Sequence, residues 1–190
     1  MIEGPRKRFK RHEEVCHRFL TFSTFRRIPL FRNPRICDRF VEHFAESRLA
    51  TGFRLVAWVI MPEHVHIILV PRAEVPVRTV LLKMKGPFAE EVIARWRELR
   101  APVLDRVTAA SGRPRFWQHG GGHDRCVRSE EKLIKNIYYI HQNPVKRGLV
   151  ADPTDWCWSS ARWYAGIREG QLPIDLPWGR PPGDIRAWGH

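Results

Sequence analysis

The 190-residue chain lacks any long hydrophobic segment, because no stretch of eighteen or more residues is both apolar and free of charge. Its first residues also lack the apolar core of a secretory signal, since Met1 to Pro5 lead directly into a run of arginine and lysine. These absences argue against a membrane-spanning or exported protein. We therefore expect a cytoplasmic protein with no membrane partner.

Cysteine and acidic residues are also sparse. The four cysteines are far apart and form no Cys-x-x-Cys pair; they are Cys16, Cys37, Cys126 and Cys157. This spacing predicts neither a zinc knuckle nor a disulfide framework, so we expect reduced thiols that are mostly buried. No cluster of aspartate and glutamate is present of the kind that a two-metal hydrolase needs.

Positive charge is abundant instead. Lys and Arg number 33 against 20 Asp and Glu, a formal net charge of +13 that favours a polyanionic partner, most simply nucleic acid. The length fits one folded domain, which we place at residues 16–165, between a basic arm (1–15) and an extended tail (166–190). The arm's phosphate-contacting candidates are Arg6, Lys7, Arg8, Lys10 and Arg11.

Hydrophobic periodicity predicts a mixture of strands and helices. Strands are expected at 17–25, 53–60 and 64–70, the last two joined by a tight turn as an antiparallel hairpin. Helices are expected at 34–50, at 75–99 with a bend or break at Gly86-Pro87, and from Ser129 to about Gly148. A short strand at 114–118 should end in the glycine-rich loop 119–125, whose glycines suit either phosphate approach or simple flexibility. The tryptophans at 156–163 are expected to cover the core.

The most informative stretch is His64-Val65-His66, which is followed by an apolar run. Alternate residues of a strand share a face, so both imidazoles should project together near the turn of the hairpin. Such a pair can be a strand end that reaches solvent or half of a metal site, and only further ligands elsewhere in the chain favour the second interpretation.

The helix after Ser129 supplies a candidate partner. Its apolar residues, Tyr138 among them, fall on one side, whereas Tyr139 falls on a polar side with Lys135, Asn136, Gln142 and Asn143. Asn143 follows Tyr139 by four residues, so the two can approach one point. Two imidazoles with an amide oxygen and water would accommodate Mg²⁺ or Mn²⁺ and argue against a closed structural zinc site.

Several motifs resemble one family, the REP-associated tyrosine transposases, which belong with the single-tyrosine HUH transposases of bacterial insertion sequences. The matching segments are 21–27 (TFSTFRR), 61–66 (MPEHVH), 116–118 (FWQ) and 139–150 (YIHQNPVKRGLV). The His-hydrophobe-His triplet alone is a weak signal, but all the motifs in this order are specific. The resemblance covers about residues 16–165.

The resemblance implies an α+β fold with a ferredoxin-like antiparallel sheet and a metal-assisted cleavage of single-stranded hairpin DNA through a 5′-phosphotyrosine. It makes Tyr139 the nucleophile and His64 and His66 metal ligands. Asn143 is the expected third ligand, although relatives use a glutamine and Gln142 is adjacent. A divalent ion and nearby Lys135 would favour the phenolate. Further DNA contacts are expected from Lys135, Lys146 and Arg147, and nucleoid association follows from the DNA partner.

Three other functions compete with this interpretation. The first is a catalytically silent protein of the same fold that binds structured nucleic acid through its basic surface. The second is a relaxase or replication initiator, although the chain has no helicase segment, and the third is a simple metal-dependent hydrolase. Relatives of this family include dimers, so a homodimer is a further expectation for which the sequence identifies no interface.

Overall fold

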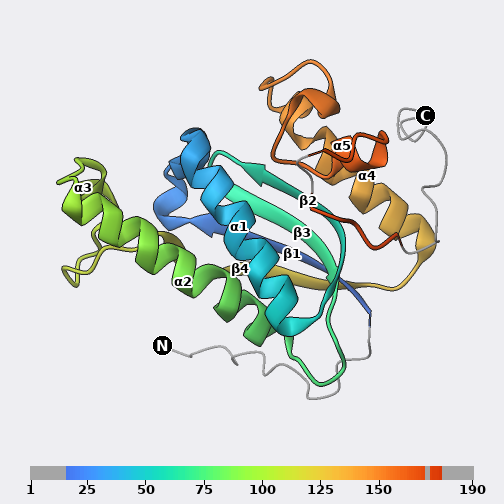
Figure 1. The fold of residues 1–190 in the computed structure, drawn as a ribbon, viewed down its shortest axis with the longest axis horizontal. Coiled ribbons are helices and arrows are strands. Elements are labelled where there is room, and N and C mark those ends of the chain that lie inside the picture. Colours follow the sequence, from blue (N-terminus) through green and yellow to red (C-terminus); the bar gives the residue numbers. More distant parts are fainter. Residues whose placement is uncertain (1–15, 170–171, 177–190) are drawn as a thin grey trace, which may run out of the picture.

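A computed structural model describes residues 16–169 and 172–176 (Figure 1). Its elements alternate as strand, helix, two strands, helix and strand, and the four strands form one sheet in the order β2-β3-β1-β4. All three strand pairs are antiparallel. This connectivity and order are those of a ferredoxin-like fold, which confirms the predicted fold class.

The element bounds follow the sequence patterns closely for most of the chain. The strands are β1 (His17–Thr24), β2 (Arg54–Met61), β3 (His64–Val70) and β4 (Trp117–Val127). The helices are α1 (Pro34–Thr51), α2 (Val77–Glu98), α3 (Val103–Val107), α4 (Glu130–Lys146) and α5 (Ala161–Tyr164), with short 3-10 turns η1 (Phe25–Arg27), η2 (Leu30–Arg32) and η3 (Pro153–Asp155).

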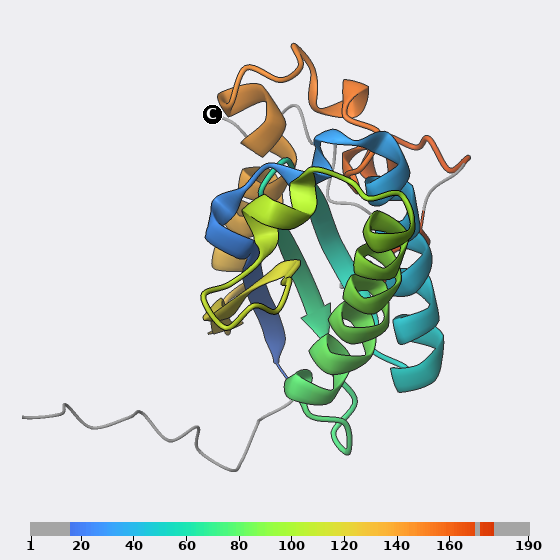
Figure 2. The same cartoon turned by 90° about the vertical axis from the view of Figure 1, so that its left-hand side faces the viewer.

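Helices α1 and α2 cover one face of the sheet, which we call the α1/α2 face (Figure 2). Helix α1 begins at Pro34, where the side chain of Asn33 accepts a hydrogen bond from the backbone N–H of Arg35, and ends at Gly52 in the left-handed region with φ 66°. Aromatic rings fill the space between this face and the two helices. The buried rings are Phe22, Phe31, Phe40, Phe44, Trp58, Phe88 and Phe116.

Helix α4 lies against the opposite face, the α4 face, where it packs on β2 (Figures 1 and 2). The segment after α4 returns along the outer edge of β2, because the backbone N–H of Ile60 donates to the carbonyl of Trp158. Trp156, Trp158 and Trp163 are partly buried against the core, as predicted. Further along, Asp175 donates its backbone N–H to the carbonyl of Leu55, so this part of the predicted tail is docked on the sheet.

The break considered at Gly86-Pro87 does not occur, and one predicted loop is a strand. Helix α2 runs without a break from Val77 to Glu98 and contains Pro87. The predicted loop 119–125 is instead part of β4, which is one strand from Trp117 to Val127 paired with β1. Backbone pairing with β1 overrides the weak strand propensity of the glycines, and Gly122 fits closely, since a Cβ there would lie 3.2 Å from the carbonyl oxygen of Thr21.

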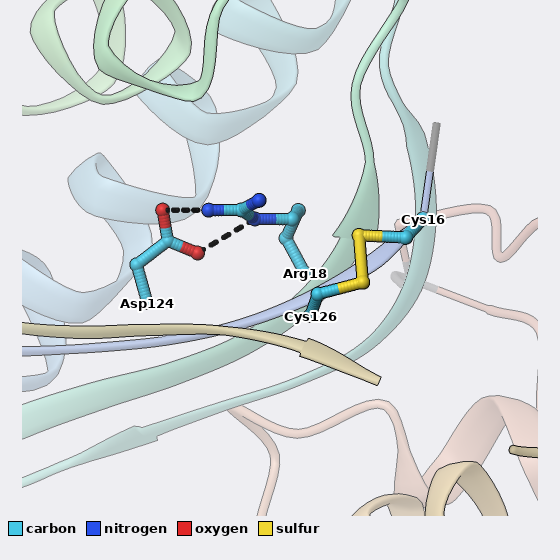
Figure 3. The surroundings of a disulfide bond; sticks show 4 residues. All are labelled: Cys16, Arg18, Asp124 and Cys126. Atoms are coloured by element: carbon cyan, nitrogen blue, oxygen red, sulfur yellow. Dashed lines mark hydrogen bonds and ion pairs between the residues drawn. A yellow bond between two sulfur atoms is a disulfide. The ribbon is translucent and has the colours of Figure 1, made fainter. Parts of the chain in front are cut away.

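The prediction of reduced, mostly buried thiols is also wrong in part. Cys16 and Cys126 form a disulfide with Cα atoms 5.9 Å apart, beside the paired side chains of Arg18 and Asp124 (Figure 3). The β1–β4 register brings these cysteines together across 110 residues of sequence, which no local spacing signal reveals. Of the other two, Cys37 is buried and Cys157 is exposed.

The predictions for the basic arm and for membrane segments are limited by which residues the structure describes. The arm that carries Arg6, Lys7, Arg8, Lys10 and Arg11 belongs to residues 1–15, which are not described. Among the helices that are described, none is long and apolar enough to cross a membrane.

Candidate active site

The two histidines of β3 form the centre of the site. His64 and His66 project from the α4 face next to the turn of the β2–β3 hairpin, where Met61 pairs with His64. Both are buried, with 6% and 5% of their surfaces exposed. Their Nε2 atoms face each other at 3.1 Å. The hairpin therefore holds two ring nitrogens at one point, as the spacing of the sequence predicts.

Each imidazole has a hydrogen-bond partner for its other nitrogen. His66 Nδ1 lies 2.7 Å from Oγ1 of Thr21, which is its direct neighbour across the β1–β3 pair. His64 Nδ1 lies 3.1 Å from Oε1 of Glu63, the residue before it in the turn. On its remaining side the ring of His66 stacks on Phe19, with centroids 5.5 Å apart. These contacts fix the orientation of both rings.

The carboxylate of Glu63 joins three parts of the chain. Its Oε1 accepts hydrogen bonds from Nη2 of Arg27, in η1, and from Nη1 of Arg147, directly after α4, each at 3.0 Å. Burial opposes the charged carboxylate, but His64 and Arg147 outweigh it and lower the pKa of Glu63. The turn before the histidine strand is thus connected to both β1 and α4.

Both imidazoles are neutral at ordinary pH. Burial lowers the pKa of His66 to about 3, with His64 and Arg27 adding to the effect. Burial also lowers the pKa of His64, although Glu63 acts in the other direction. A neutral imidazole has a lone pair on one ring nitrogen, which is the form that binds a metal ion.

Tyr139 faces the histidines from α4. Its ring meets the ring of His66 edge-on, with centroids 5.4 Å apart, and lies 6.4 Å from that of Phe19. The side chain is 41% exposed, so the phenol is open to a substrate. The predicted polar side of this helix is confirmed for Tyr139, and the structure brings Tyr139 and the histidine pair together.

The sequence of α4 explains why Tyr139 is placed there. Ser129 caps the helix by accepting from the backbone N–H of Lys132, and acidic residues occupy the first turn. Its buried apolar residues turn toward the sheet; they are Leu133, Ile137 and Ile140. Buried His141 lies with its Nε2 2.8 Å from Oγ of Ser160, which itself bonds to the backbone of Trp58 in β2. The helix is therefore anchored to the sheet next to the tyrosine.

The two candidates for a third ligand have different surroundings. Asn143 is buried, with 6% of its surface exposed, one helical turn after Tyr139. Gln142 instead lines a cavity of about 250 Å³ with Tyr138, His141 and residues 151–154. This cavity has no residue of the histidine pair in its lining. Asn143 as the third ligand stays a prediction.

The side chains present fit a divalent cation. Two ligand atoms that lie about 2.1 Å from one ion, at a right angle to each other, are about 3 Å apart, and the Nε2 atoms of His64 and His66 are 3.1 Å apart. Within 16–169 and 172–176, no group of three or more His, Cys, Asp or Glu converges in a way that could hold a metal. Among the described residues, a third protein ligand would therefore be of another residue type, and the amide of Asn143 is the predicted one.

The cations near the tyrosine differ from the expected ones. Lys135 forms an ion pair with Glu131 at 2.6 Å on the exposed surface of α4. Lys146 lies over the ring of Tyr139, with Nζ 5.7 Å from its centroid. Lys146, rather than Lys135, is the cation that this geometry places on the tyrosine ring.

Sequence reasoning gave no role to Glu63, Thr21, Phe19 or Arg27, although all four contact the histidines or their partners. Glu63 was part of the MPEHVH motif, and its position next to His64 was a usable signal. Thr21 and Arg27 stood in the TFSTFRR motif. The contacts of Thr21 and Phe19 depend on the position of β1 beside β3, and that of Arg27 on the turn η1, neither of which periodicity specifies.

Together the fold and the site define a class of protein: a ferredoxin-like domain that brings a histidine pair and a helical tyrosine together on one face of its sheet. The family described as "Transposase IS200 like" matches residues 14–143. The chain belongs to this IS200-like transposase family.

Two known proteins illustrate the relationship. A REP-associated tyrosine transposase of Escherichia coli is 30% identical over 129 residues, which cover 65% of this chain and 62% of that protein. The match thus spans less than two thirds of the relative's length. A solved structure of a REP-associated tyrosine transposase bound to a REP hairpin superposes with a TM-score of 0.63 at 20% identity, covering 96% of this chain and 93% of that one. This likeness confirms the fold.

Proposed function

We propose that the protein nicks and rejoins single-stranded hairpin DNA, with Tyr139 as the nucleophile and a divalent cation, Mg²⁺ or Mn²⁺, held by His64 and His66. The observation that carries this proposal is the contact between Tyr139 and His66, whose ring centroids are 5.4 Å apart. It unites a nucleophile with paired neutral imidazoles in a family of transposases. Asn143 is the proposed third ligand.

The reaction is a transesterification. The phenolate oxygen of Tyr139 attacks a backbone phosphorus and the bond from that phosphorus to the 3′ oxygen breaks. The tyrosine is then joined to the 5′-phosphate of the downstream fragment. The departing oxygen takes up a proton and becomes a free 3′-hydroxyl. Because one phosphoester replaces another, the reverse attack by a 3′-hydroxyl can rejoin strands without ATP.

Different side chains have different roles in this reaction. When bound, the divalent ion polarises the scissile phosphate and offsets the negative charge that grows on it. His64, His66 and Asn143 hold that ion in place. The ammonium of Lys146 lies over the ring of Tyr139 and places positive charge beside the nucleophile.

The proposed substrate is hairpin DNA with a single-stranded flank. Support comes from the formal charge of +13 and from the E. coli relative, a REP-associated transposase. The protein in the solved structure of the same fold is bound to a REP hairpin. Lys146 places positive charge over the ring of Tyr139, and the half-exposed Arg147 places it at Glu63, beside His64. The alternative is a silent hairpin-binding protein of the same fold.

Incubation of the protein with end-labelled hairpin DNA and Mg²⁺ separates these functions. We expect a covalent protein–DNA adduct that survives denaturing electrophoresis, disappears in Tyr139→Phe and persists in the matched variant Tyr138→Phe. Cleaved DNA without any adduct would indicate a hydrolase instead. A stable complex without cleavage would support the silent binding protein.

A further inference from the structure

Among the described residues, only Glu63 forms a carboxylate hydrogen bond with a histidine of the site. It lies in the turn before β3 and is buried, with 7% of its surface exposed. A single oxygen, Oε1, is within 3.1 Å of His64 Nδ1 and within 3.0 Å of a guanidinium nitrogen of Arg27 and of Arg147. Three elements therefore meet at this oxygen.

The two arginines determine what this carboxylate can do. Their side chains are 60% and 49% exposed, while that of Glu63 is 9% exposed, so both guanidinium groups reach inward to it from the rim. A carboxylate paired with two guanidinium groups is ionised and can only accept hydrogen bonds. His64 must then donate from Nδ1–H, which leaves its lone pair on Nε2, the atom that faces His66.

Thr21 offers an instructive contrast at the other histidine. Its Oγ1 lies 2.7 Å from Nδ1 of His66. A hydroxyl can donate or accept, so Thr21 orients the ring of His66 without deciding which nitrogen carries the proton. The two imidazoles of the pair thus have unequal partners: one is held in a single tautomer by an anion, and the other is not.

We propose that Glu63 is a positioning residue, which holds His64 as the Nδ1–H tautomer with Nε2 aimed at the shared metal position. Through Arg147 it also ties the end of the Tyr139 helix to the histidine strand, so one carboxylate aligns both halves of the site. Partners of this kind orient metal-binding histidines and raise their basicity. The inference deepens the proposed function and rests on the role of His64 as a ligand there.

The first test reads the tautomer directly. Nitrogen-15 NMR of the histidine rings, in protein treated with EDTA, distinguishes Nδ1–H from Nε2–H. We expect Nδ1–H at His64 in the unaltered protein and a mixture dominated by Nε2–H in Glu63→Ala and Glu63→Leu, which remove the acceptor oxygen. Thr21→Val is the matched control, because it removes the partner of His66 and should leave the His64 signals unchanged.

The second test measures Mn²⁺ affinity by electron paramagnetic resonance. We expect Glu63→Leu to weaken binding about 10- to 100-fold, the loss typical when the hydrogen-bond partner of a metal-binding histidine is removed. Glu74→Gln serves as the control for a lost negative charge, since Glu74 pairs with Arg72 on the exposed surface. It should bind Mn²⁺ as the unaltered protein does.

The outcomes distinguish a failure of this inference from a failure of the proposed function on which it rests. An unchanged His64 tautomer in Glu63→Leu overturns the inference, even if Mn²⁺ binding weakens, because the loss then reflects charge alone. If the tautomer changes but the unaltered protein binds no Mn²⁺, the metal site of the proposed function fails while the positioning of His64 stands. Should Glu63→Ala fail to fold, Glu63→Leu decides the question alone.

Discussion

The two faces of the sheet are built from the same four strands but differ in kind. On the α1/α2 face, rings such as Phe22, Phe40 and Phe88 pack mainly against one another. The polar groups that touch them, Lys85 over Phe22 and His43 against Phe88, lie at the margin of this aromatic cluster. On the α4 face, α4 packs on β2 and leaves the histidine pair beneath a half-exposed tyrosine. Adjacent residues of one strand, such as Val65 and His66, therefore point to opposite faces and have different roles.

The α1/α2 face therefore contributes mainly to the stability of the fold, whereas the α4 face carries the candidate active site. Burial of aromatic rings is the main favourable contribution on the α1/α2 face. On the α4 face, buried polar groups cost free energy unless they are hydrogen-bonded, and here Thr21 and Glu63 meet that requirement for the two histidines. The account predicts that the faces can be damaged independently.

The largest expected effect is on the α4 face. His64→Ala should abolish cleavage of hairpin DNA, because the paired Nε2 site is lost, and should leave hairpin affinity within about twofold, since binding rests on the basic surface. Single-turnover cleavage and a fluorescence binding titration measure the two quantities. Equal losses of binding and cleavage would show that the histidines also recognise DNA.

On the opposite face, Phe88→Ala should lower the free energy of unfolding by about 3–5 kcal/mol. Its ring is fully buried and lies 4.8 Å from that of Phe116 and 5.1 Å from that of Phe40, measured between centroids. Urea denaturation gives the stability, and cleavage per folded molecule should remain unchanged. A loss of cleavage in the folded fraction would mean that the two faces are coupled.

The identity of the third ligand can be tested by comparing two adjacent residues of α4, Asn143 and Gln142. Asn143→Ala should weaken Mn²⁺ binding about tenfold or more, because it removes an oxygen ligand, whereas Gln142→Ala, in the cavity beside Tyr138, should leave it unchanged. Calorimetric titration with Mn²⁺ makes the comparison. The reverse order of effects would move the ligand to Gln142.

The smallest effects come from helix caps, one for each face. Ser129→Ala and Asn33→Ala remove the side-chain caps of α4 and α1, and each should cost about 1 kcal/mol of stability. Only the first change loosens the helix that carries Tyr139. Thermal unfolding should show similar losses, while the nicking rate should fall in Ser129→Ala alone; an equal fall in both would contradict the division.

The sequence predicts the local features of this fold well. Alternation of residue types predicts β1 and the β2–β3 hairpin, and helical spacing with capping residues predicts α1 and α4. The same patterns place His64 and His66 on one strand face and Tyr139 on the polar side of its helix. Each of these predictions depends on residues within one or two elements.

What the sequence does not predict depends on register between distant strands. Pairing with β1 makes a strand of the glycine-rich segment and brings Cys126 to Cys16. It also takes tertiary contact to bring Arg27 and Arg147 to Glu63, from positions 36 and 84 residues away. Partners of this kind need the whole fold before they can be named.

The central claim is that one divalent ion lies between the two histidines within reach of Tyr139. Anomalous diffraction from crystals soaked in Mn²⁺ tests it most directly. The account predicts a peak about 2.1 Å from Nε2 of both His64 and His66, with Asn143 beside it. A peak elsewhere, or none in crystals of protein that cleaves hairpin DNA with Mn²⁺, would contradict it.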